Sequence, residues 1–177
     1  MLYIVAALKS EAQAFVDKYK LTKTKCGNFT LFIGEDLKLV ISGIGSAKAK
    51  KATSMLIEKF VPIESDIFIN VGICGANQKY KIGKLLEIGS VIYEDKTFVI
   101  NENLSHVLTC KESEVYDNFY EIVDMESFGF YEATKEIRNR RIYKVVSDHF
   151  EPSCVTKEGT KMLISSVINE IIQKAKI

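Results

Sequence analysis

The sequence has 177 residues, 47% of them hydrophobic, which suits one folded domain with a sizeable core. Its net charge of +1 gives neither the basic surface of a nucleic-acid-binding protein nor an acidic tail. No apolar run reaches the roughly 18 residues of a membrane helix, and the start lacks the basic region of a secretory signal. We therefore expect a single domain over residues 1–177, in a soluble cytoplasmic protein that binds neither nucleic acid nor membrane.

The cysteines and histidines do not form a metal-binding pattern. The four cysteines lie far apart, without a C-x-x-C pair, and His106 and His149 are the only histidines. Zinc sites normally use close pairs of such residues, so we expect no metal. Free thiols in a reducing compartment are the simplest interpretation, although the sequence leaves a disulfide open.

The first half of the chain alternates strands and helices. A nearly continuous apolar run predicts a buried strand at 2–8, and a helix follows at 10–18. Residues 29–34 and 37–42 read as a hairpin. The stretch "GIGSAK" then forms a turn, with Ser46 as the expected N-cap of a helix that ends at Phe60. Another buried strand, 66–71, is expected to end at "GICGAN".

The second half continues this alternation. Strands are expected at 85–94, 97–100, 104–110 and 143–147, and helices at 125–138 and 156–175. The order predicts an α/β domain with three layers, α/β/α, and a mixed central sheet. Ligands bind at the carboxyl ends of strands in such sheets. Four stretches stand there: "LKSEA", "VGICGAN", "VDMES" and "VVSDHF".

Several acidic residues in these stretches permit both a structural and a functional interpretation. Glu11 could stabilise the first turn of a helix, and Asp148 could cap a turn or act as a proton donor with a raised pKa. In "IVDMESFGF" we expect Asp124 to cap the following helix, which leaves Glu126 to point toward the strand ends. His149 is expected to be a loop histidine.

The glycine-containing stretches are less decisive. "GIGSAK" has Lys48 in place of the third glycine of a dinucleotide-binding motif, so a tight turn into a helix is favoured. Gly72 and Gly75 could let a ligand approach the backbone closely, or could let the main chain cross a neighbouring helix.

Read in order, the motifs resemble the nucleoside phosphorylase superfamily. They are most similar to its hydrolytic branch, the 5'-methylthioadenosine/S-adenosylhomocysteine nucleosidases, and to the hexameric purine nucleoside phosphorylases. The matching stretches are "IVAALKSEA", "GIG", "GICGAN", "IGSVIY", "VDMES" and "VVSD". The spacing of about twenty residues between "VDMES" and "VSD" is fairly specific.

The resemblance implies a role for each matching residue. Glu126 would accept hydrogen bonds from the ribose hydroxyls and stabilise the positive charge that develops on the sugar, and Met125 would pack on the ribose. Asp148 would protonate the purine, with Ser147 orienting it. Glu11 would hold and deprotonate the attacking water. No cofactor is implied.

The sequence also departs from the family pattern. The chain is shorter than the usual member, between Tyr93 and about Cys110. Ile73, which follows Gly72 in the substrate loop, replaces a serine that contacts the nucleophile. Asn70 stands where the phosphorylases have an arginine. Lys144 replaces another arginine, and Glu114 stands where an aromatic residue stacks on the base.

We therefore expect a nucleosidase that cleaves the N-glycosidic bond of a purine nucleoside, such as methylthioadenosine, by water attack. One alternative is a purine nucleoside phosphorylase in which Lys144 binds phosphate. A second alternative is a degenerate member that binds a nucleoside or a partner protein without turnover. The family resemblance implies a homo-oligomer, with a dimer as the expectation.

Overall fold

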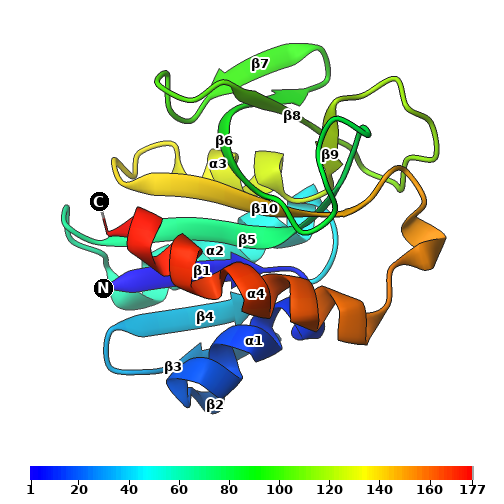
Figure 1. The fold of residues 1–177 in the computed structure, drawn as a ribbon. Helices are drawn as coiled ribbons and strands as arrows, with labels where there is room; N and C mark the ends of the chain where they lie inside the picture. The colour runs from blue at the N-terminus through cyan, green and yellow to red at the C-terminus, as the bar shows by residue number, and fades with distance from the viewer. Residues whose placement is uncertain (177) are drawn as a thin grey trace.

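A computed structural model describes residues 1–176 of the chain (Figure 1). One ten-stranded mixed sheet forms its centre, and helices cover both faces. The strands are β1 (Leu2–Ala6), β2 (Thr22–Cys26), β3 (Phe29–Ile33), β4 (Leu37–Ile41), β5 (Ile67–Ala76), β6 (Leu85–Tyr93), β7 (Lys96–Val99), β8 (His106–Cys110), β9 (Ile122–Asp124) and β10 (Arg140–Asp148). The helices are α1 (Lys9–Tyr19), α2 (Ser46–Phe60), α3 (Ser127–Thr134), α4 (Lys157–Ala175) and the short 3-10 turn η1 (Pro152–Cys154).

The alternation of side chains along the strands creates two hydrophobic cores. In β1, Leu2 and Ile4 belong to the core beneath α1 and α4, whereas Tyr3 and Val5 belong to the core beneath α2 and α3. All four side chains are buried, as expected for a central strand with helices on both faces. The predicted three-layer α/β/α fold with a mixed sheet is confirmed.

Part of the sheet closes on itself. Strand β5 is parallel to β1 and β10, and β10 pairs with β6. Strands β6, β8 and β9 follow in order, and β9 returns to β5. These five strands form a ring, with β1, β4, β3 and β2 extending from it. The carboxyl ends of β1, β5, β8, β9 and β10 supply the segments around one cavity.

The expectation that the strand predicted at 66–71 ends at "GICGAN" is wrong. β5 continues to Ala76, because Ile73 and Cys74 pair with β10 and Gly75 pairs with β9. Pairing on both sides outweighs the weak strand propensity of glycine. Gly72 serves the site instead: a Cβ there would lie 2.9 Å from Glu11 Oε1.

Two helix boundaries also differ from expectation. Ser46 is the first residue of α2 rather than its N-cap. The N-cap is Gly45, whose φ of +107° favours glycine and which has no side chain to accept a capping hydrogen bond. Helix α3 begins at Ser127 rather than Met125 and ends at Thr134 rather than Arg138. Beyond that end, the Arg140 guanidinium donates hydrogen bonds to carbonyls of the last turn and the following loop. Strands β2 and β9 were not predicted.

Candidate active site

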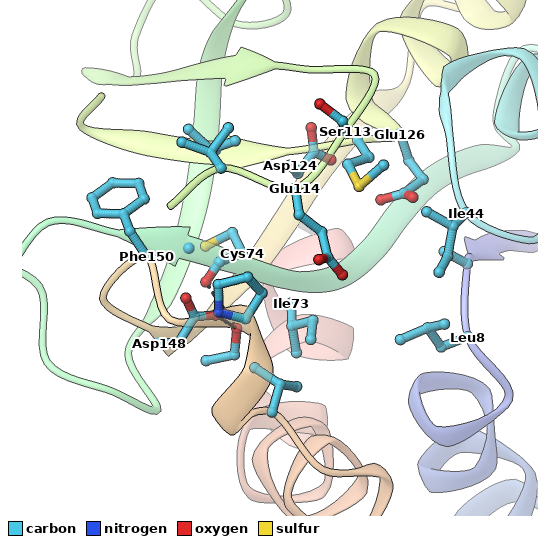
Figure 2. Close-up of a pocket in the computed structure, with 18 of the residues that line it drawn as sticks. Leu8, Ile44, Ile73, Cys74, Ser113, Glu114, Asp124, Glu126, Asp148 and Phe150 are labelled. Atoms are coloured by element: carbon cyan, nitrogen blue, oxygen red, sulfur yellow. Dashed lines mark hydrogen bonds between the residues drawn. The ribbon is translucent and has the colours of Figure 1, made fainter. Parts of the chain in front are cut away.

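A cavity of about 260 Å³ opens at the carboxyl ends of the strands (Figure 2). Its walls come from five segments that are distant in the sequence: the β1–α1 connection, the loop before α2, the end of β5, the β8–β9 connection with β9 and Glu126, and the end of β10 with the loop after it. Its size lies just below the range of typical small-molecule sites. The topology therefore produces the arrangement that the four sequence stretches predicted.

Glu11 lies in the first turn of α1 and is held by three backbone N–H groups. Oε2 accepts hydrogen bonds from Ala7 and Leu8 at 2.9 and 2.8 Å, and Oε1 accepts one from Ile73 at 3.0 Å. Burial raises the pKa of Glu11, while these N–H groups and the charge of Lys144 oppose that rise. A carboxylate whose pKa is raised is a better base for water than one with its ordinary pKa.

Asp124 holds both the start of α3 and a buried lysine. Its carboxylate accepts hydrogen bonds from the Ser127 amide and hydroxyl, so it supplies the cap expected from the sequence. Its Oδ2 also lies 2.7 Å from Lys144 Nζ, and both side chains are 1% exposed. Burial alone would lower the pKa of Lys144, but the surrounding carboxylates raise it above its ordinary value. Lys144 is therefore a buried, charged member of an ion pair.

Glu126 is the carboxylate that faces the cavity with an open oxygen. Oε1 accepts a hydrogen bond from the Gly45 amide at 2.9 Å, and within residues 1–176 Oε2 has no hydrogen-bond partner. The side chain is 8% exposed. Burial and the negative charge of Asp124 raise the pKa of Glu126 to about 7, against the opposing charge of Lys144. This open oxygen can accept hydrogen bonds from a ligand.

Asp148 ends β10 on the opposite wall of the cavity (Figure 2). Its Oδ1 accepts a hydrogen bond from the Glu151 amide at 2.9 Å, and its Oδ2 lies 2.7 Å from Ser147 Oγ. Ser147 Oγ also lies 3.1 Å from the Cys74 carbonyl oxygen. The Ser147 hydroxyl can donate its single proton to Asp148 Oδ2 or to the Cys74 carbonyl. These contacts fix the orientation of the acid.

The structure brings together six of the eight residues proposed from the sequence. Those on the cavity wall are Glu11, Ile73, Met125, Glu126, Ser147 and Asp148. Gly72 and Lys144 lie outside the lining; a Cβ on Gly72 would be 3.4 Å from Lys144 Nζ. Both act on Glu11 instead: Gly72 approaches its carboxylate closely, and the charge of Lys144 opposes the rise of its pKa.

Other residues of the wall were not singled out from the sequence. Phe150, Pro152 and Val155 come from the loop after β10, and Cys74 comes from β5. Gly75, which the sequence had indicated as a possible point of close ligand approach, also lies on this wall. Phe150 has a φ of +64° and lies 3.6 Å from the position that a Cβ on Gly75 would occupy. The sequence feature that could have indicated Phe150 is "SDHF", in which an aromatic residue follows the end of a strand. His149 instead bonds the Ala76 carbonyl through Nδ1 at 2.9 Å.

Other kinds of site are not found in the described part of the chain. No cluster of histidine, cysteine, aspartate and glutamate side chains in residues 1–176 has a metal-binding arrangement. The four cysteines form no disulfide there. None of the helices within those residues has the length and apolar character required to cross a membrane.

The comparisons with known proteins agree with the motifs. No model of a protein family matches the sequence. Over 101 residues the chain is 31% identical to a 5'-methylthioadenosine/S-adenosylhomocysteine nucleosidase of Staphylococcus epidermidis. That match covers 54% of this chain and 43% of the relative's length.

Three solved structures have the same architecture. The S. pneumoniae 5'-methylthioadenosine/S-adenosylhomocysteine nucleosidase, with a transition-state inhibitor, has a TM-score of 0.84 at 17% identity, covering 99% of this chain and 98% of that one. The Neisseria meningitidis nucleosidase, with methylthio-immucillin-A, has a TM-score of 0.81 at 17% identity and covers 98% of each chain. Futalosine hydrolase of Helicobacter pylori has a TM-score of 0.79 at 12% identity, covering 98% and 97%.

These likenesses confirm the resemblance that the motifs indicated. The sequence match and the structural matches point to the same group of proteins. The chain has the fold of the 5'-methylthioadenosine/S-adenosylhomocysteine nucleosidases of the nucleoside phosphorylase superfamily.

Proposed function

We propose that this protein is a nucleosidase that hydrolyses the N-glycosidic bond of a purine nucleoside of the methylthioadenosine type. The observation that carries the proposal is the meeting of Glu11, Glu126 and Asp148, from three distant segments, around one cavity. Each of these buried carboxylates lowers stability unless its environment compensates for the lost solvation. A purely structural role does not require three of them on one cavity wall.

We assign a separate task to each carboxylate, and the geometry of the cavity supports this assignment. The open Oε2 of Glu126 would accept hydrogen bonds from the ribose diol, and its charge would stabilise the oxocarbenium-like sugar as the bond breaks. Asp148, oriented by Ser147 and the Glu151 amide, would donate a proton to the leaving purine. Glu11 would position the water and accept its proton.

The reaction balances with water as the only co-substrate. The water oxygen forms a bond to the anomeric carbon as the bond from that carbon to the purine nitrogen breaks. The electron pair of the broken bond stays on the purine, which takes its proton from Asp148. Glu11 accepts the proton that the water loses, and proton exchange with solvent restores both carboxyl groups.

The surroundings of Lys144 favour hydrolysis over phosphorolysis. A phosphate-binding Lys144 would have to leave Asp124, which lies 2.7 Å away in a fully buried pair. Separating such a pair leaves an uncompensated charge in the interior. The nucleosidase relative supports the same choice.

The test is release of free base from a panel of purine nucleosides, including methylthioadenosine, with and without phosphate. The proposal predicts release without phosphate. Release that requires phosphate would replace it with the phosphorylase alternative, and binding without release would favour the non-catalytic alternative. The homodimer stays a prediction, which the mass of the protein in solution can test.

A further inference from the structure

The cavity wall is strongly acidic. Five carboxylates line it, and within residues 1–176 no lysine, arginine or histidine side chain does so. They belong to Glu11, Glu114, Asp124, Glu126 and Asp148. The buried ammonium of Lys144 is paired with Asp124, and its charge also acts on Glu11 and Glu126, so several carboxylates share this one buried cation. A positively charged ligand would be attracted to such a cavity, and an anionic one repelled.

Glu114 stands apart from the catalytic carboxylates. It lies in the connection between β8 and β9, and its side chain points into the cavity (Figure 2). The Tyr116 hydroxyl donates to its Oε2 at 2.7 Å, and no hydrogen bond to its Oε1 occurs in the described residues. In the sequence it occupies the position where we expected an aromatic residue to stack on the base. The resemblance thus implies that this position faces the base rather than the sugar.

Glu126 gives independent evidence that the cavity is built for a ligand. Its side chain is more than nine-tenths buried, yet Oε2 has no partner within residues 1–176 and is directed at the cavity. An acceptor in this position needs donors from a ligand. The same side chain marks where the sugar would lie, so Glu114 is left to face the other part of the substrate.

We propose that the cavity prefers ribosides whose base carries a positive charge, and that Glu114 sets this preference. The inference rests on the nucleosidase function proposed above. The substrate class is a riboside of an N-alkylated purine or a similar cationic heteroaromatic base. Such a base already carries the charge that a neutral purine gains only when Asp148 protonates it.

The reaction of a cationic riboside needs no proton from the enzyme. As the bond from the anomeric carbon to the ring nitrogen breaks, the electron pair moves to that nitrogen and cancels its positive charge. Water forms the new bond to the anomeric carbon, and its proton passes to Glu11 and then to solvent. The products are the neutral base, ribose and one proton.

The test compares 7-methylguanosine, which is cationic at about pH 6, with neutral guanosine. For the unmodified protein and for each variant, kcat/KM is measured for both nucleosides and expressed as a ratio. The two nucleosides differ in intrinsic reactivity, but this difference is the same for every protein, so a change in the ratio reports the substitution alone. We expect Glu114→Gln to lower the ratio roughly three- to tenfold at low salt, and less at high salt.

Glu112→Gln is the matched control. Glu112 lies two residues away, accepts a hydrogen bond from the Tyr93 hydroxyl at 2.9 Å, and is not part of the cavity wall. Its substitution removes the same charge from the same loop, and we expect the ratio to stay that of the unmodified protein. An equal fall in both variants would mean that only the general charge of the loop matters, and would overturn the proposal.

The remaining outcomes separate this inference from the proposed function. Hydrolysis of both nucleosides with an unchanged ratio in Glu114→Gln would reject the role of Glu114 and leave the nucleosidase intact. If neither nucleoside is hydrolysed, equilibrium dialysis gives their dissociation constants. Tighter binding of 7-methylguanosine that weakens in Glu114→Gln alone would support the preference, and equal binding of both nucleosides would reject it.

Discussion

Glu126→Gln should make the protein more stable at alkaline pH, although it removes a residue of the proposed active site. Burial and Asp124 raise the pKa of Glu126 from 4.5 to about 7. Below pH 4.5 this group is protonated in both the folded and the unfolded protein, and folding carries no penalty from its charge. As the pH rises through about 7, the folded protein must also ionise the group in its buried site, and the free energy of unfolding falls. A shift of this size corresponds to about 3 kcal/mol of folding free energy.

Glutamine removes the ionisation and retains the acceptor. Its amide oxygen can still accept the hydrogen bond that Gly45 donates to Glu126. At about pH 8 we expect the variant to be more stable by about 3 kcal/mol, or about 6–12 °C in Tm. At about pH 5 the carboxyl group is mostly protonated in the folded protein, so we expect the two proteins to differ by less than about 1 kcal/mol.

Urea unfolding and thermal melting at both pH values measure this effect. Glu132→Gln is the control, because Glu132 lies in α3, the helix that Glu126 precedes, but is half-exposed and pairs with Lys50 at the surface. We expect a change of at most about 0.5 kcal/mol for that variant at either pH. A Glu126→Gln variant that is no more stable than the unmodified protein at pH 8, or equally stabilised at both pH values, would refute the reasoning.

Other changes test other parts of the site. Asp148→Asn should keep the fold and lose about 10²–10⁴-fold in kcat on neutral purine nucleosides, measured by base release; full activity would remove Asp148 as the acid. Lys144→Met should lower the free energy of unfolding by about 3–5 kcal/mol, because Asp124 would remain buried without its partner. Urea unfolding checks this value, and a loss below about 1 kcal/mol would show that the pair is not structurally important. Gly72→Ala would place a Cβ 2.9 Å from Glu11 Oε1. We expect it to lower the free energy of unfolding by about 1–3 kcal/mol and to reduce kcat. An unchanged free energy of unfolding together with an unchanged kcat would argue against the tight fit.

The sequence predicted much of the architecture because its strands and helices have clear periodicity. The buried run that forms β1 and the apolar face of α4 were evident from local pattern alone. The proposed site residues followed from short motifs at strand ends, and six of them line one cavity. Here local sequence and topology give the same answer.

The features that were missed depend on pairing between distant segments. No local pattern indicates that Asp124 and Lys144 form a buried pair, because their contact arises only when β9 and β10 join the ring of strands. The continuation of β5 through its glycines likewise depends on partners on both sides. Strand β9 has three residues, which is too short for a periodic signal.

The most direct test of the account is the identity of the sugar released from methylthioadenosine in a buffer that contains phosphate. Mass spectrometry distinguishes the free sugar from its 1-phosphate. We predict free methylthioribose, formed at the same rate with and without phosphate, since Lys144 is held by Asp124 and water is the nucleophile. Formation of the sugar 1-phosphate would contradict the account and identify a phosphorylase.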